Sequence, residues 1–307
     1  MDKIVSVGIR ITRKCNLKCP YCNITSTNKK ELTTNEWKNV IDILECYKIN
    51  KIVILGGEPT LYPDIVTIVD YIVNNKKMEC SLTTNGINNK DIIDKLIKTG
   101  ITSLGVSVDN LDFKKSISPL KCKSGLEVIS QYCNSNRIVS YIVLSKKNID
   151  SITELIKYFD SINVKSYILP YHWGNINDFD HRKEESLDNA FITDEDISKL
   201  GNVIDRIIEM KKTGVSIVNS IMFLENIKKH IRNLDWKCSG LSELRVDSDG
   251  SLACCCDKIG EKSQNYSIFD LKDQYLNFIN DRNEDASTCK GCLWPSAFES
   301  ELKRSKK

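Results

Sequence analysis

The stretch Arg13-Lys14-Cys15-Asn16-Leu17-Lys18-Cys19-Pro20-Tyr21-Cys22 follows an apolar run at residues 4–11, and its three cysteines have the spacing Cys-x3-Cys-x2-Cys. Three thiolates this close together can bind one small metal cluster. They cannot complete a cubane iron–sulfur cluster, in which each of the four irons needs a terminal ligand. One iron is left open to bind and reduce a small molecule. A zinc knuckle or a chance cluster of cysteines is the alternative. Structural zinc sites need four ligands, commonly from two Cys-x2-Cys pairs, and this run offers three cysteines.

This cysteine spacing resembles the signature of the radical S-adenosylmethionine (radical SAM) superfamily, and Tyr21 lies where that family usually has an aromatic residue. The resemblance implies that the open iron of a [4Fe–4S] cluster chelates the methionine amino and carboxylate groups of SAM. An electron from the cluster then cleaves the sulfonium and yields a 5′-deoxyadenosyl radical. The cofactor carries that chemistry, and the protein supplies positioning and exclusion of water.

Four further segments resemble motifs of this family. Gly56-Gly57-Glu58-Pro59 follows the second strand-like run and resembles the motif whose backbone contacts the SAM amino group. Polar residues follow the third, fourth and fifth runs, where the family places groups that contact the SAM carboxylate and ribose. Ordinary turn chemistry is the alternative for the Asn-Gly and Asp-Asn pairs. The SAM-binding residues implied by the resemblance are Gly56, Gly57, Glu58, Pro59, Asn85, Ser107, Asp109 and Asn148.

Strand-like and helical patterns alternate over the first 170 or so residues. Apolar runs occur at 4–11, 51–55, 78–84, 101–108, 138–144 and 165–169. Alternating strands and helices predict parallel strands joined by helical crossovers. Six such units fit an α/β fold of the partial (β/α)6, TIM-like type, which is the fold of the radical SAM core. A doubly wound open sheet is the alternative, and in either fold the active residues lie at the carboxyl ends of the strands.

Composition excludes several classes of protein. The 307 residues carry a net charge of only +3 without a basic stripe, so we expect no nucleic-acid partner. There is no apolar run long enough to span a membrane and no signal peptide. Thirteen cysteines in such a chain favour metal binding over disulfides. We therefore expect a cytoplasmic, oxygen-sensitive protein that does not bind membranes.

A second group of cysteines lies near the C-terminus: Cys238, the triple Cys254-Cys255-Cys256, and the pair Cys289-x2-Cys292. By spacing alone, four of these thiolates could form a zinc ribbon. The order also resembles the twitch domain, a short form of the SPASM domain that holds one auxiliary [4Fe–4S] cluster. Its Gly-x4-Cys pattern, counted from Gly250, selects Cys255. The resemblance implies the ligands Cys238, Cys255, Cys289 and Cys292, in a small α+β domain at 236–307 that follows a core at 1–235.

Together these features predict an enzyme that cleaves SAM reductively and abstracts a hydrogen atom from its substrate. The resemblance favours a ribosomally made peptide as the substrate, with an auxiliary cluster that takes the electron and a donor such as flavodoxin or ferredoxin. Dehydrogenation or epimerisation of a sugar or aminocyclitol is the alternative. A non-catalytic iron–sulfur or zinc protein is disfavoured, because Gly56-Gly57-Glu58-Pro59 would then have no purpose.

No catalytic acid or base can be assigned from the sequence. Neighbouring residues on a strand point to opposite faces, so Cys254 and Cys256 should point away from the side that Cys255 occupies. One of them is a candidate hydrogen-atom donor to a substrate radical, with simple packing as the alternative. His172 begins a long polar stretch, 171–191, and is a candidate for substrate contact because loops of this length are usually functional or disordered.

Overall fold

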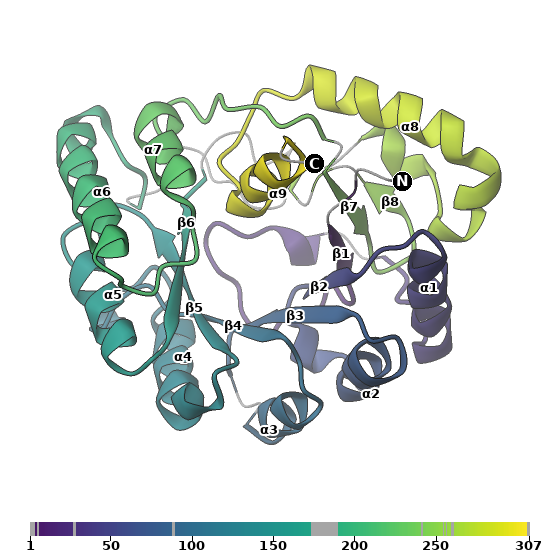
Figure 1. The fold of residues 1–307 in the computed structure, drawn as a ribbon, viewed down its shortest axis with the longest axis horizontal. Coiled ribbons are helices and arrows are strands. Elements are labelled where there is room, and N and C mark those ends of the chain that lie inside the picture. Colours follow the sequence, from purple (N-terminus) through teal and green to yellow (C-terminus); the bar gives the residue numbers. More distant parts are fainter. Residues whose placement is uncertain are drawn as a thin grey trace.

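The computed structural model describes residues 4, 6–26, 29–87, 90–172, 190–240, 242–253, 255, 257–258 and 261–305. In this part of the chain, six parallel strands lie side by side in sequence order, each hydrogen-bonded to the next. They form a curved sheet with helices on its outer side (Figure 1). The predicted α/β partial barrel is confirmed. The six strands are β1 (Ser6–Arg10), β2 (Lys51–Leu55), β3 (Glu79–Thr84), β4 (Ser103–Ser107), β5 (Ile138–Leu144) and β6 (Lys165–Pro170).

The crossover helices pack apolar faces onto the sheet. Helix α1 shows how the sequence specifies one: Thr33 and Glu36 form a capping box at its start, which satisfies free backbone N–H groups. Its buried face is Trp37, Val40, Ile41 and Leu44, as the periodicity predicted. None of the helices in the described ranges is long and apolar enough to cross a membrane. The helices are α1 (Thr34–Cys46), α2 (Ile65–Asp70, continued by the π-helical turn Tyr71–Asn75), α3 (Lys90–Lys98), α4 (Pro119–Tyr132), α5 (Ile152–Ser161), α6 (Ile197–Lys212) and α7 (Ile221–His230).

The two faces of the strands differ in burial. In β2, Ile52 and Ile54 are fully buried under the helices, whereas Val53 and Leu55 face the lumen and are partly exposed. The interior of a closed TIM barrel is filled by layers of side chains. Here a cavity of ≈ 360 Å³ remains between the strands and the C-terminal helix. The lumen is therefore hollow and can admit a ligand.

The C-terminal segment adds to the same sheet. β7 (Glu243–Val246) pairs in parallel with β1, and β8 (Leu252–Ala253) returns antiparallel to β7. The turn between them contains Gly250 at φ +85°, a conformation that favours glycine. These two strands form a hairpin that continues the core sheet. The division into domains 1–235 and 236–307 stays a prediction.

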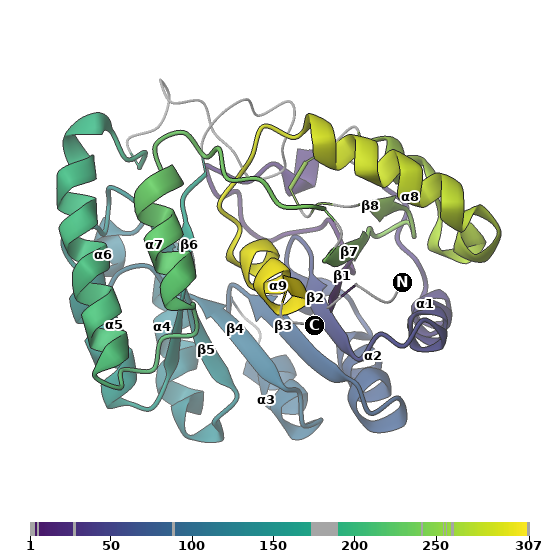
Figure 2. The ribbon, with the colours of Figure 1, turned by 45° about the horizontal axis from the view of Figure 1, so that its top comes forward.

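Two helices complete the chain, α8 (Leu271–Thr288) and α9 (Pro295–Ser305). α9 lies across the opening between β6 and the β1–β7 edge (Figures 1 and 2). It packs on α7, where the Phe223 and Phe298 rings are 5.4 Å apart between centroids. Residues of α9 line the 360 Å³ cavity, so this helix closes one side of the lumen.

Candidate active site between two cysteine groups

The three cysteines of the 15–22 run line one cavity at the carboxyl ends of the strands, with a volume of ≈ 230 Å³. The loops that follow β1, β2, β3 and β4 converge there, as expected for a parallel barrel. Five of the predicted SAM-binding residues also line this cavity: Gly56, Gly57, Glu58, Asn85 and Ser107.

The two glycines of the loop after β2 bring it against the cysteine-bearing loop. The Gly57 N–H donates to the Thr12 carbonyl over 2.9 Å, and the Glu58 N–H donates to the Lys14 carbonyl over 2.8 Å. A Cβ at position 57 would lie 2.3 Å from the Lys14 carbonyl oxygen, and one at position 56 would lie 2.8 Å from that of Thr12. In this structure, glycine is therefore required for close approach to the cysteine loop.

We expect Gly57→Ala to displace the cysteine loop. Overpacking of this kind costs about 1–3 kcal/mol, so the melting temperature of the metal-free protein should fall, and less iron should bind after anaerobic reconstitution. Gly201→Ala is the matched control: no atom lies within 4 Å of its Cβ position, and it is inside helix α6. That variant should be as stable as wild type or more so. Wild-type iron content and melting temperature in Gly57→Ala would refute this role.

Glu58 joins the loop after β2 to the end of β3. Its buried carboxylate accepts hydrogen bonds from the Thr84 hydroxyl at 2.7 Å, the Asn85 N–H at 2.8 Å and the Thr60 hydroxyl at 2.5 Å. Burial raises the pKa of Glu58, and these hydrogen bonds oppose that effect. The carboxylate therefore orders two of the loops that frame the cavity.

Asn85 extends this connection to the cysteine loop. Its side-chain amide donates to Asn16 Oδ1 over 2.8 Å, and its own Oδ1 accepts from the Ile87 N–H at 2.9 Å. The second contact is the local turn chemistry expected of an Asn-Gly pair. Asn85 thus shapes a turn and also holds a residue between Cys15 and Cys19.

Three other residues predicted to bind SAM are not among those that line the cavity. Pro59 is buried at the start of a 3-10 turn. Asp109 accepts a hydrogen bond from the Ser116 hydroxyl. The Asn148 amide donates to the Asp109 and Val143 carbonyls over 2.8 and 2.9 Å. Each has a clear structural contact, and SAM binding by these three stays a prediction.

Two of the cysteine thiols have polar neighbours. The Leu17 N–H donates to Cys15 Sγ over 3.4 Å, and Cys19 Sγ lies 3.7 Å from Ser118 Oγ. Burial raises the pKa of Cys15, and the nearby Cys19 and Cys22 thiols add to that effect. Cys15 therefore has both partner cysteines within electrostatic reach.

These thiols fit a cluster better than a single ion. Within the described ranges, no three His, Cys, Asp or Glu side chains are grouped so as to hold one metal ion. A cubane makes a different demand, because each thiolate binds a separate iron. Three thiols that face one cavity, with one N–H directed at a sulfur, meet that demand.

The second group of cysteines is also brought together. Burial raises the pKa of Cys238 to about 12, with further increases from Cys255 and Cys289. Burial raises the pKa of Cys292 as well, with contributions from Cys255 and Cys238. These effects place the four predicted ligands within electrostatic range of one another, although among the described residues no three of them are grouped closely enough to hold a single metal ion. Cys254 and Cys256 lie outside the described residues, and the ligand assignment stays a prediction.

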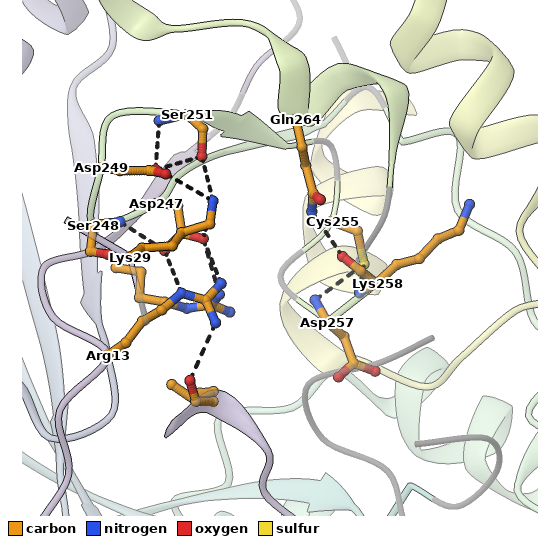
Figure 3. Close-up of polar contacts among 12 residues, drawn as sticks. Arg13, Lys29, Asp247, Ser248, Asp249, Ser251, Cys255, Asp257, Lys258 and Gln264 are labelled. Carbon is orange, nitrogen blue, oxygen red and sulfur yellow. Dashed lines mark hydrogen bonds and ion pairs between the residues drawn. The ribbon is translucent and has the colours of Figure 1, made fainter. Parts of the chain in front are cut away.

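Backbone N–H groups point at Cys255, as Figure 3 shows. Asp257 and Lys258 each donate to Cys255 Sγ over 3.4 Å, and the Gln264 amide donates to the Lys258 carbonyl over 3.2 Å. Hydrogen bonds of this kind orient ligand thiolates and tune the potential of a cluster. The Asp257–Cys255 bond has the same two-residue offset as the Leu17–Cys15 bond in the first group.

His172 supports the second group of cysteines. Its Nε2 accepts from the Leu293 N–H over 2.9 Å, and its ring stacks on Trp294 at 4.7 Å between centroids. Both partners directly follow Cys292 in sequence. His172 is buried, so its observed role is to hold the segment that carries Cys292. Substrate contact by His172 stays a prediction, and residues 173–189 of the polar stretch lie outside the described residues.

An ion-pair group links the two cysteine-bearing regions (Figure 3). Arg13 binds Asp247 through Nε at 3.1 Å and NH2 at 2.5 Å. Lys29 Nζ lies 3.2 Å, and Arg10 NH1 3.6 Å, from the same carboxylate. Burial alone would raise the pKa of Asp247, but these three cations hold it well below its usual value. Arg13 precedes Cys15 by two residues, so this group attaches the first cysteine loop to the β7–β8 hairpin.

Three cavities that share lining residues reach both groups of cysteines. Leu55 lines the 230 Å³ cavity, the 360 Å³ cavity and a small space beside Cys255. Arg10 lines the first and the last of these, and Arg245 lines the second and the last. Gly8 makes room for Arg245, because a Cβ there would lie 1.8 Å from a guanidinium nitrogen. The sequence prediction missed both arginines, although two-residue alternation along β1 and β7 places them on the lumen face.

A sequence model described as the Radical SAM superfamily matches residues 9–159. The chain belongs to the radical SAM superfamily. The matched range contains the first group of cysteines, the Gly56-Gly57-Glu58-Pro59 loop and the ends of β3 and β4. The chain is thus a radical SAM enzyme that uses a [4Fe–4S] cluster and SAM.

Several known proteins are similar to this radical SAM enzyme. A probable GTP 3′,8-cyclase of Methanococcus aeolicus is 28% identical over 277 residues, 82% of this chain and 85% of the relative. One from Methanococcus maripaludis is 38% identical over 113 residues, 36% of this chain and only 38% of the relative. The crystal structure of Streptococcus suis SuiB has a similar fold, with a TM-score of 0.63 and 17% identity over 82% of this chain and 60% of SuiB.

Proposed function

We propose that this enzyme cleaves SAM at the Cys15–Cys19–Cys22 site and abstracts a hydrogen atom from a small anionic substrate held in the lumen. The observation that carries the proposal is that the cavities beside the two groups of cysteines share lining residues. The cavity lined by the three cysteines shares Arg10 and Leu55 with the space beside Cys255. A substrate there would lie between the two groups of thiols.

The residues around this lumen have separable roles in the proposal. When bound, the SAM-binding cluster, SAM and an auxiliary cluster at Cys238, Cys255, Cys289 and Cys292 would supply radical formation and removal of one electron from the substrate. Gly57 and Glu58 hold the cysteine loop in place. Trp294 and α9 close the lumen and limit access of water. A flavodoxin- or ferredoxin-like donor would supply the first electron.

A nucleotide is the substrate class that we favour. Arg10 and Arg245 line the lumen, where they pair with Asp247 at 3.6 Å and with Glu243 at 2.8 Å. The fork of donors on an arginine also suits a carboxylate or phosphate, which would bind here alongside these two carboxylates. Two of the similar proteins above are named as probable GTP 3′,8-cyclases, and one of them matches 82% of this chain. A lumen covered on one side by α9 also suits a small molecule better than a long chain.

A peptide, the class favoured by sequence analysis, is the second candidate. SuiB, which shares the fold, has been crystallised with its precursor peptide. A peptide would have to enter the lumen with a single residue, because α9 and Trp294 close it. A neutral sugar or aminocyclitol is the remaining alternative and would make little use of the two arginines.

A test of the proposal compares wild type with Cys255→Ala under reducing, anaerobic conditions, with SAM and a panel of nucleoside triphosphates. One nucleotide should raise 5′-deoxyadenosine formation by wild type and should change in mass. Cys255→Ala should still make 5′-deoxyadenosine but should give little oxidised product, because the substrate radical would lack an oxidant. Cys46→Ala, at an exposed and isolated thiol, is the control.

Other outcomes would contradict separate parts of this account. If no nucleotide acts but a precursor peptide does, the substrate class is wrong and the SAM chemistry stands. If the site at Cys255 contains zinc, the electron-transfer role is excluded, because Zn²⁺ has no redox chemistry. If Cys255→Ala retains the full iron content, Cys255 is not the ligand within the triple.

A further inference from the structure

Lys121 is a buried lysine that no sequence motif indicated. It lies in the first turn of α4, with 7% of its surface exposed. Its Nζ donates to the Tyr21 hydroxyl over 2.6 Å and lies 5.3 Å from the centroid of the Tyr21 ring. Among the described residues, no carboxylate lies within ion-pair distance of this ammonium. The Lys121 ammonium is therefore hydrogen-bonded but is not neutralised by a carboxylate in direct contact.

This arrangement is costly in the absence of a ligand. Burial of an ammonium without a directly paired anion costs several kcal/mol. The first turn of a helix adds to the cost, because the helix dipole disfavours cations there. Asp109 is close enough to act on Lys121, but its carboxylate accepts from the Ser116 hydroxyl and the Ile117 N–H instead. An additional negative charge is needed to balance Lys121.

The position of Lys121 shows where that charge would be. Lys121 lines the same cavity as Cys15, Cys19 and Cys22. Burial lowers the pKa of Lys121, but Tyr21, Cys19 and Asp109 raise it more, so the side chain stays charged. Its partner Tyr21 directly precedes Cys22, and Cys19 Sγ lies 3.7 Å from Oγ of Ser118, the N-cap of the same helix. The positive charge is therefore held beside the first group of thiols.

We propose that the Lys121 ammonium is the counter-charge of the SAM-binding cluster and raises its reduction potential. This inference rests on the proposed function. A cubane with three thiolates is already anionic and becomes more so when it accepts one electron from a flavodoxin- or ferredoxin-like donor. A fixed cation favours the reduced form, since net charge and hydrogen bonding set the potentials of these clusters. Tyr21 positions the ammonium.

The test is a redox titration of Lys121→Met monitored by electron paramagnetic resonance. The cluster of interest is the one whose reduced signal changes on addition of SAM, and its midpoint is titrated without SAM. The equilibrium constant for reduction should fall at least tenfold, which is 59 mV for a one-electron couple. Lys123→Met, an exposed lysine on the same helix that lies 6.0 Å over the Phe113 ring, should keep the wild-type midpoint.

Several outcomes would overturn this role. An unchanged midpoint in Lys121→Met with full iron content would do so. An unchanged midpoint with weaker SAM binding would assign Lys121 to the SAM carboxylate instead. If the methionine variant holds no iron, Lys121→Gln is titrated, with the same expectation. Wild-type protein that binds no iron at Cys15, Cys19 and Cys22 would overturn the proposed function itself.

A second readout separates the electrostatic role from a structural one. In the metal-free protein, Lys121→Met removes a poorly balanced buried charge, so its melting temperature should equal or exceed that of wild type. If Lys121 served only to stabilise the fold, the melting temperature of metal-free Lys121→Met would be lower than that of wild type. A lower melting temperature together with a wild-type midpoint would mean that Lys121 serves packing only.

Discussion

Replacement of Cys15, Cys19 and Cys22 together by alanine will abolish SAM cleavage. The three thiols face one cavity with Gly56, Gly57 and Glu58, and no other described cysteine lines it. The second group of cysteines should assemble independently, so iron after reconstitution should fall from about eight to about four atoms per chain. Iron and 5′-deoxyadenosine are both measured on anaerobically prepared protein.

A matched variant tests whether this loss is specific. Three free cysteines belong to neither group: Cys46, Cys80 and Cys122. Of these, Cys46 is exposed. Cys46→Ala should keep both the iron and the cleavage rate of wild type. Formation of 5′-deoxyadenosine by the triple variant at the wild-type rate would disprove the assignment of the cluster site.

Asp247→Asn will lower the free energy of unfolding by about 3–5 kcal/mol, the range observed when one member of a buried ion pair is removed. The Arg13 and Asp247 side chains are 8% and 12% exposed, and Arg10 and Lys29 share the same carboxylate. Chemical denaturation at neutral pH measures the change. Iron retention should also fall, because Arg13 anchors the loop that carries Cys15.

The pH dependence of this effect has a definite sign. The pKa of Asp247 is held well below its usual value, so its stabilising contribution is present above the unfolded pKa of about 3.9. Wild type should lose that contribution as the pH falls below about 4 toward the depressed pKa of Asp247 in the folded protein. The difference in the free energy of unfolding between wild type and Asp247→Asn should therefore narrow.

Asp205→Asn is the control for this prediction. Asp205 pairs with Lys228 at 2.6 Å, but both side chains are well exposed. It should change stability by less than about 1 kcal/mol. Equal losses in the two variants would show that burial does not strengthen the Asp247 group.

Local patterns in the sequence were sufficient to predict the barrel. The run at 51–55 coincides with β2, because four consecutive apolar residues, three of them β-branched, are followed by a turn of two glycines. They could not predict that β7 pairs with β1, since that pairing joins segments more than 230 residues apart. An Asp-Gly turn is a local signal for the hairpin, but the strand that the hairpin pairs with in the sheet is a tertiary property.

The candidate site was predicted where residue type and spacing together suggest one chemistry. The two groups of cysteines and the Gly56-Gly57 pair are of that kind. Lys121 and Arg245 were missed because lysine and arginine are ordinary surface residues, and only burial distinguishes them. His172 was noticed for its place in a long polar stretch. Its contacts with Leu293 and Trp294 could not be predicted, because those residues are far away in sequence.

The most direct test of the central claim is the amount of 5′-deoxyadenosine formed by iron-loaded, chemically reduced protein supplied with SAM. The account predicts that wild type forms it and that the Cys15/Cys19/Cys22 triple alanine variant forms none. Absence of 5′-deoxyadenosine from wild-type protein shown to hold a [4Fe–4S] cluster at these cysteines would contradict it.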